Sequence, residues 1–323
     1  MKRIMKWSIP VALLVLLILS FSLSAQLNKL CPSISLRYDA PLVEDQVEWS
    51  RHYTAEYGAP YLTFWTESQT YVSIEDMGAS AAQILYNGDP ELPYPVTYRY
   101  GGTPGMDQTA CSISIGLAWQ LWQSDRVVGM TMEIDGQEYT VSGVFEGDDN
   151  RLFRWGNSGF TAVEIPNTPK GEDSYRYALD LAAQSGLGHP SGVLWGSGMA
   201  DIGKLLCWMP LVLAACFLIF PCLVKLKKLP GLVWAVIALI LVLALPAIIE
   251  ILPGWIVPTR WSDFGFYGRL WETFLDRWWD LLMLSPTPMD AQRKAIFLGL
   301  LFSSFGSCVL TEAFNRAFFQ DAT

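Results

Sequence analysis

Side chains that could carry out chemistry are few in this chain and widely spaced. Its 323 residues include 2 histidines, His52 and His189, and 6 cysteines without a CxxC pair. This spacing favours neither a Cys/His zinc site nor a histidine-based catalytic triad. The motifs GxSxG, HExxH and GxxxxGK[ST] are also missing, so serine hydrolase, zinc protease and P-loop chemistry are not indicated. We expect a protein that is not an enzyme and that holds no metal, cofactor or ATP of its own.

Two smaller groups of residues leave alternatives open. Cys31 and Cys111 fall in a segment expected on the oxidising side of a membrane, where they form either a disulfide or two free thiols. The acidic run at 146–150 offers several oxygen ligands, but its spacing is not that of the EF-hand loop. The run therefore favours a solvated turn over a calcium site.

The composition indicates a membrane protein. Hydrophobic residues make up 51% of the chain and charged residues 16%, which is too apolar for an ordinary soluble protein. Its 14 tryptophans suit the interface between lipid and water. Residues 31–200 hold 22 acidic and 8 basic residues, so this acidic part is not a nucleic-acid binder.

The N-terminal segment, residues 1–30, is expected to be a transmembrane anchor or a signal peptide. Lys2, Arg3 and Lys6 precede an almost wholly apolar run from Trp7 to Ala25. Basic residues before an apolar stretch are typical of both alternatives. In either case the chain that follows crosses the membrane.

A C-terminal membrane domain is expected at 204–323, with spans at about 205–224, 231–252 and 295–310. Lys225, Lys227 and Lys228 end the first of these spans. Positive charge favours the cytoplasmic side, so we expect the N-terminus, the 225–230 loop and the C-terminus in the cytoplasm. Residues 31–203 then form an extracytoplasmic domain.

Two features of the C-terminal part predict helix packing. At about 263–284, apolar side chains recur on one face of an expected helix, and charged side chains, including Arg277, lie on the other. This pattern favours a helix that lies in the outer membrane interface. The alternative is a gate or a lipid-contact element. Gly299, Ser303 and Ser307 form a small-residue face in the last span. That face is expected to pack against a helix of the same chain rather than against another subunit.

The most informative part of the extracytoplasmic domain runs from Ser112 to Phe145. Its first part predicts a helix with Leu117 and Leu121 on one face. Its second part alternates apolar residues on both sides of Asp135-Gly136, which predicts a hairpin that pairs 134 with 137, 132 with 139 and 130 with 141. Met130, Met132, Tyr139 and Val141 would then share a face.

This segment resembles the extracytoplasmic core domain of MacB-type ABC transporter permeases, and the whole-chain plan resembles the FtsX-like permeases with a divergent transmembrane half. The matching signature residues are Ser114, Leu117, Ala118, Leu121, Val128, Gly129, Asp135, Gly136, Tyr139, Thr140, Val141, Gly143 and Val144. The resemblance implies a multi-pass α-helical membrane protein of about four spans, one before and three after a mixed α/β (α+β) domain with two subdomains. It further implies a permease dimer and a separate cytoplasmic ABC ATPase that supplies the energy from ATP.

Two functions follow from this resemblance. One is a permease-like subunit of an ABC-type export or mechanotransmission complex, with an ATPase subunit and a second permease-like subunit as partners. The other is a membrane-anchored binding or sensing protein that has lost ATPase coupling. The short 225–230 loop favours the second, because it leaves little room for the docking element that such permeases carry there.

Overall fold

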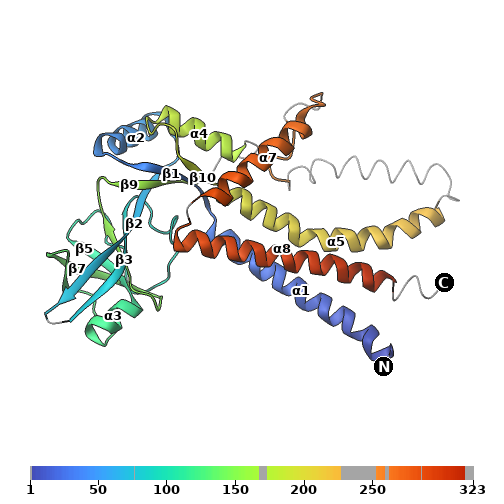
Figure 1. Ribbon diagram of the computed structural model, residues 1–323, viewed down its shortest axis with the longest axis horizontal. Coiled ribbons are helices and arrows are strands. Elements are labelled where there is room, and N and C mark those ends of the chain that lie inside the picture. The colour runs from blue at the N-terminus through green and yellow to red at the C-terminus, as the bar shows by residue number, and fades with distance from the viewer. Residues whose placement is uncertain are drawn as a thin grey trace.

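A computed structural model describes residues 2–75, 77–166, 173–226, 252–258, 262–284 and 286–316. Figure 1 shows a mixed α/β domain at one end of the molecule and long helices that run away from it. Among these described residues, three helices are long and apolar enough to cross a membrane, over Ser8–Leu30, Gly196–Phe217 and Pro288–Asn315. The expected span at 231–252 lies outside the described residues except for its last residue.

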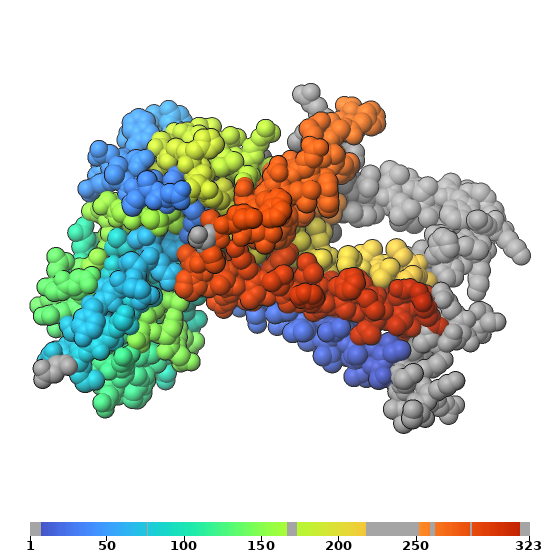
Figure 2. Space-filling view, in the orientation of Figure 1, coloured from blue at the N-terminus to red at the C-terminus, as the bar shows by residue number. Residues whose placement is uncertain are grey.

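The three long helices are α1 (Lys2–Leu30), α5 (Gly196–Leu226) and α8 (Pro288–Asn315). In the space-filling view of Figure 2, α8 lies along the front between α1 and α5. Helix α8 begins at Pro288, before the expected start of the last span at about 295. Its start is set by Thr287, whose hydroxyl accepts a hydrogen bond from the backbone N–H of Asp290 at 3.3 Å.

Small residues bring α8 close to the other two helices. The Ser20 hydroxyl of α1 donates to the Ser303 hydroxyl at 2.9 Å, and the Ser304 hydroxyl donates to the carbonyl of Leu206 in α5. A Cβ atom on Gly299 would lie 3.5 Å from the Leu23 side chain. The expectation that this face packs within the chain is therefore confirmed.

The domain is built on one mixed sheet of ten strands, with the order β10-β1-β9-β2-β3-β8-β5-β7-β4 and with β6 paired to β2 and β7. Most neighbours are antiparallel, whereas β3 with β8 and β5 with β7 are parallel. The strands are β1 (Ser33–Leu42), β2 (Thr63–Ile74), β3 (Met77–Asn87), β4 (Tyr98–Gly101), β5 (Ala110–Ser114), β6 (Thr131–Ile134), β7 (Gln137–Phe145), β8 (Arg151–Trp155), β9 (Phe160–Pro166) and β10 (Gly192–Leu194).

The end of the sheet nearer the long helices is covered by α2 (Glu44–Tyr57) and α4 (Ser174–Gln184). Their inward residues, such as Val47 and Leu181, join Leu36, Phe64 and Val163 of the strands in one buried cluster. Apolar side chains on both helices thus remove one face of β1, β2 and β9 from water.

The remote end of the domain holds the predicted helix and hairpin. Helix α3 (Ile115–Trp122) packs Leu117, Ala118 and Leu121 into a second cluster with β5, β6 and β7. The predicted hairpin register is confirmed, with Met132 opposite Tyr139 and Ile134 opposite Gln137. Met130 follows the same register, since its carbonyl accepts a hydrogen bond from the backbone N–H of Val141 at 2.8 Å, but its side chain is 44% exposed.

Helix α7 (Phe266–Met283) occupies most of the expected interfacial helix at 263–284. Part of its predicted apolar face packs on the protein instead: Phe274 stacks on Trp255 and Trp278 contacts Phe297 of α8. Arg277 was placed on the solvated face, and this was wrong. Its side chain is 5% exposed and pairs with Asp173, which caps α4. The sequence around Arg277 could not indicate this partner, because Asp173 lies in a distant segment.

Candidate functional site

A cluster of buried charges joins the domain to the long helices. Asp290, in the first turn of α8, is fully buried. Its two carboxylate oxygens accept hydrogen bonds at 3.1 and 3.0 Å from one nitrogen of Arg37, which lies on β1. Arg293, one turn further along α8, also donates to Asp290, at 3.2 Å. We call Arg37, Asp290 and Arg293 the charged junction.

The local sequence of α8 fixes Asp290 in place. Thr287 and Asp290 form a capping box, in which the Asp290 carboxylate accepts from the backbone N–H of Thr287 at 3.3 Å. A carboxylate is also stabilised at a helix N-terminus by the unpaired backbone N–H groups and the helix dipole. The Asp290 side chain therefore caps the N-terminal end of α8 and also pairs with both arginines.

Arg293 extends the charged junction to two further segments. Its Nε donates to the carbonyl of Leu30, the last residue of α1, at 2.7 Å, and its Nη2 donates to the carbonyl of Pro93 at 3.0 Å. The carbonyls at the end of a helix have no partner within the helix, so Arg293 satisfies one of them. The side chain is only 2% exposed, so these bonds form away from water.

Arg37 connects the charged junction to the sheet. Its guanidinium lies 4.5 Å from the centre of the Trp65 ring. The indole N–H of Trp65 donates to Glu164 at 3.0 Å, and the hydroxyl of Ser33 donates to the same carboxylate. Glu164 is 1% exposed. Two arginines and two carboxylates thus balance in charge, which is the condition for burying them at tolerable cost.

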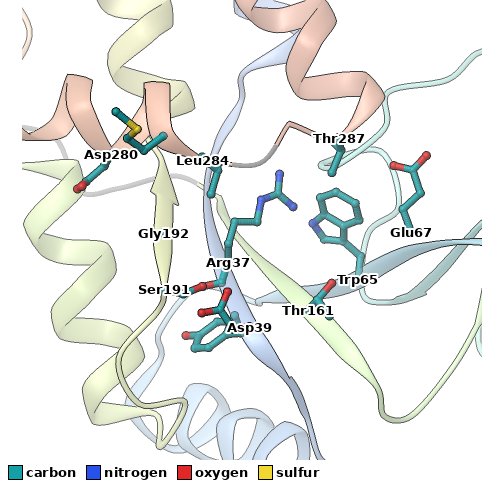
Figure 3. A pocket seen from close by; sticks show the side chains of 12 residues that line it. Arg37, Asp39, Trp65, Glu67, Thr161, Ser191, Gly192, Asp280, Leu284 and Thr287 are labelled. Atoms are coloured by element: carbon teal, nitrogen blue, oxygen red, sulfur yellow. The ribbon is translucent and has the colours of Figure 1, made fainter.

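A pocket of about 410 Å³ opens beside the charged junction. Figure 3 shows Arg37 and Trp65 at its centre, with Thr287 and Glu67 to one side and Asp280 of α7 to the other. Because Asp290 already matches the charge of Arg37, the carboxylates of Asp39, Glu67 and Asp280 give the lining a negative character. Glu67 accepts a hydrogen bond from the hydroxyl of Tyr94, whose pKa is raised chiefly by burial.

A second polar link ties α7 to the domain. Arg277 pairs with Asp173 and lies over the rings of Tyr175 and Trp195, at 4.5 and 4.8 Å. The hydroxyl of Tyr175 donates to Asp280 at 2.7 Å. The helix is therefore held to α4 by charged and aromatic contacts together.

These contacts hold structural elements together. Neither histidine belongs to the charged junction, and His52 is an exposed residue paired with Glu56 at 3.5 Å. In the part of the chain that the structure describes, no group of three or more His, Cys, Asp or Glu side chains is placed to hold a metal ion. The charged junction therefore links β1, the end of α1 and the start of α8.

The predicted signature residues lie far from the charged junction, at the remote end of the domain in Figure 1. Six of them are core residues of one cluster: Leu117, Ala118, Leu121, Tyr139, Val141 and Val144. Ser114 caps α3, and Gly143 is so close to Gly102 that a Cβ would lie 2.3 Å from its carbonyl oxygen.

The remaining signature residues shape turns or face solvent. Asp135 and Gly136 make the hairpin turn with φ of +50° and +81°, and Gly129 has a φ of +88°. Val128 is 46% exposed, and Thr140 is exposed on β7. Most of the signature residues are thus core, cap or turn residues of the domain.

Cys31 and Cys111 are free thiols in the structure, so the disulfide is not formed. They lie in different clusters, Cys31 near α1 and α8 and Cys111 at the remote end. Burial raises the pKa of Cys31 to about 11 and that of Cys111 to about 12. Both side chains act as small buried apolar groups.

Sequence reasoning missed Arg37, Asp290 and Glu164 and treated Arg293 only as a charge before a span. Two signals pointed to them. The segment T-P-M-D at 287–290 is a helix-start pattern with an acid in the first turn. Glu164 is the one charged residue in the largely buried strand β9, and a buried charge needs a partner.

Comparison with known proteins gives structural neighbours only. No family model matches the chain, and no curated protein matches it by sequence. Among solved structures, the periplasmic region of MacB from Actinobacillus actinomycetemcomitans is similar, with 9% identity and a TM-score of 0.43 over 54% of this chain and 92% of that one. Like the segment from Ser112 to Phe145, this likeness is to a MacB-type permease domain.

A second neighbour is the extracellular domain of the noncanonic ABC-type transporter YknZ from Gram-positive bacteria. It has 12% identity and a TM-score of 0.36, and the match covers 47% of this chain and 94% of that one. Both neighbours are domains outside the membrane, and the match in each case covers about half of this chain.

Proposed function

We propose that this protein is a permease-like integral membrane subunit of an ABC-type export or mechanotransmission complex, without an ATPase of its own. The observation that carries the proposal is the charged junction. Asp290 and Arg293 fix the start of α8 to β1, to the end of α1 and to the carbonyl of Pro93. A displacement of α1 or α8 would therefore be passed to the domain rather than absorbed in a loose linker.

The proposed topology places the domain outside the cytoplasm. Basic residues at 2–6 and 225–228 favour the cytoplasmic side for the ends of α1 and α5 that lie away from the domain. The acidic domain then faces the outside, and the C-terminus lies in the cytoplasm. The span expected at 231–252 would return the chain to the outer side before α7 and α8.

Energy would come from partner subunits. The chain has no P-loop motif, so ATP would act through a cytoplasmic ABC ATPase, with a second permease-like subunit completing the pair. ATP hydrolysis would move α1, α5 and α8, and the charged junction would transmit this movement to the domain, where cargo or an envelope partner is contacted.

Affinity purification of the full-length protein from its native membrane, in mild detergent and with mass spectrometry of co-purifying proteins, tests this proposal. We expect an ATP-binding subunit in stoichiometric amount and a second copy or a second permease-like chain. If the protein is folded and membrane-inserted but no ATPase accompanies it, the proposal fails. Asp290→Asn should retain the ATPase partner, because Asp290 lies at the domain end of α8.

The alternative is a membrane-anchored binding or sensing protein, and the pocket beside Arg37 favours it. A negatively lined pocket of about 410 Å³ suits a small or extended cationic ligand. Under this alternative, the full-length protein would retain an envelope component or peptide after removal of any ATPase partner. The binding would weaken in Trp65→Ala, which removes the aromatic wall, and would be unchanged in Trp119→Ala at the remote end.

A further inference from the structure

Helix α7 carries an apolar surface that the protein itself leaves uncovered. Trp271, Leu275, Trp279 and Leu282 are spaced by four, four and three residues, so they form one stripe along the helix. Their exposed fractions are 62%, 44%, 57% and 61%. A stripe of two tryptophans and two leucines is a much larger apolar surface than scattered exposed side chains provide.

The stripe cannot turn inward, because an adjoining side of α7 is already engaged. Phe274, Trp278 and Leu281 pack against the protein, with the Trp278 ring 5.1 Å from that of Phe297 in α8. Arg277 pairs with Asp173. These contacts fix the rotation of the helix about its axis, so the stripe faces away from the protein.

The contact between Trp278 and Phe297 places α7 at the outer end of a candidate span. The 28 residues of α8 extend about 42 Å, whereas the hydrocarbon layer is about 30 Å thick. Phe297 is nine residues from the start of α8, so it lies near the outer boundary of that layer. Figure 1 shows α7 leaving the base of the domain there and diverging from α5 and α8.

We propose that this stripe of α7 binds the outer leaflet of the membrane, with its tryptophans at the boundary between headgroups and acyl chains. Tryptophan suits this position because its ring is apolar and its N–H is polar. The neighbouring polar side of α7 exposes Glu272 and Asp276. Two copies meeting stripe to stripe would bring these acids near their own counterparts, whereas a zwitterionic lipid surface brings no such repulsion.

Glu272 and Asp276 also determine which lipid headgroups the stripe can bind. Attraction to anionic headgroups requires basic residues, and the exposed Arg269 is paired with Asp263. The stripe would therefore bind through burial of apolar area and would show no preference for anionic lipid. Held in this way, α7 would anchor the base of the domain to the outer leaflet beside the moving helices.

Site-specific photocrosslinking tests this inference in the full-length chain. Leu275→p-benzoylphenylalanine places the probe on the stripe, and Asp276→p-benzoylphenylalanine places it one residue away on the polar side. Both proteins are reconstituted in phosphatidylcholine vesicles, irradiated and analysed by mass spectrometry. We expect a lipid adduct severalfold more abundant at position 275 than at 276, and an equal yield when part of the lipid is replaced by phosphatidylglycerol.

A probe at Phe302, which is 70% exposed on α8, separates this inference from the proposed function. A lipid adduct at 302 shows that the chain is inserted in the vesicle. If 302 reacts with lipid and 275 does not, or if 275 and 276 react equally, the lipid contact of α7 is refuted while membrane insertion stands. A crosslinked dimer at 275 without a lipid adduct assigns the stripe to a second copy instead.

Discussion

The charged junction and the remote core of the domain are held together by opposite means. The remote core around α3 is almost wholly apolar, with Ile113, Leu117 and Val144 fully buried. The charged junction buries Asp290 and Arg293 just as completely, but by pairing them. The remote core is therefore stabilised mainly by apolar burial. The charged junction connects the domain to the helices, and each of its buried charges depends on its partners.

The two regions also differ in how far apart their partners lie in the sequence. The helix and hairpin of the remote core come from one segment, residues 110–145. In the charged junction, Arg37 and Asp290 are 253 positions apart, and Arg293 and Leu30 are 263 apart. A contact of this kind ties the C-terminal helix to the first strand, so it forms only when the whole chain is folded.

The largest effect is expected at Asp290. Asp290→Ala leaves the buried guanidiniums of Arg37 and Arg293 without their carboxylate, and breaking a buried pair from one side costs about 3 to 5 kcal/mol. Denaturant unfolding of the full-length protein in detergent measures the change. Glu312→Gln is the matched control, because its pair with Arg316 is exposed and should contribute less than about 1 kcal/mol. An equal loss of unfolding free energy in the two variants would contradict the role of Asp290 in pairing both arginines.

The next effect is expected in the remote core. Leu117→Ala removes a fully buried side chain and should cost about 2 to 4 kcal/mol through lost burial and a residual cavity. Combined with Asp290→Ala, the loss should be additive, since the two sites share no contacts. Trp119→Ala, at an exposed position of the same helix, serves as control. A strongly non-additive double variant would mean that the two regions are energetically coupled.

A smaller effect is expected at the cap of α3. The Ser114 hydroxyl accepts from the backbone N–H of Leu117 at 3.2 Å and of Arg151 at 3.1 Å, and it donates to the carbonyl of Asp149. Ser114→Ala leaves these buried groups without a partner and should destabilise the protein by about 1 to 2 kcal/mol. Ser124→Ala, whose hydroxyl accepts from an exposed backbone N–H, should have a smaller effect in the same unfolding assay.

The smallest effect is a pH dependence from Cys111. Burial raises the pKa of its thiol from the ordinary 9.0 to about 12, so above 9.0 the unfolded chain loses a proton that the folded chain keeps. Stability from this group is intact below pH 9 and falls as pH rises towards 12, by about 1 kcal/mol at pH 10. Unfolding of Cys111→Ala should lack this component. A parallel pH dependence in both proteins would contradict a thiol kept neutral by burial.

The remote core could be predicted from the sequence because its signals are local. Alternation on both sides of Asp135-Gly136 fixed the register, and the spacing of Leu117 and Leu121 fixed the inner face of α3. The small-residue face of α8 was also readable, since Gly299 and Ser303 recur at helical spacing. Each of these features depends on residues within a few turns of one another.

The charged junction could not be predicted because its partners meet only in the tertiary structure. Arg37 lies in a strand whose pattern gives no sign of a carboxylate, and Arg277 lies on a helix where it resembles a solvated charge. The same limit affected α7. Its periodicity predicted an amphipathic helix. Which apolar side packs inward is decided by Trp255 and Phe297, which lie outside the helix, each 19 positions from the residue it contacts.

The central claim is that the charged junction makes the domain and α8 move as one body. Pulsed electron paramagnetic resonance tests it with spin labels at His52→Cys on α2 and Phe302→Cys on α8, in a chain whose native cysteines are replaced. Both positions are exposed. We expect one narrow distance distribution, and a much broader one in Asp290→Asn, which keeps the shape of the side chain but removes its charge. A broad distribution in the parent chain, or no change in Asp290→Asn, would contradict the claim.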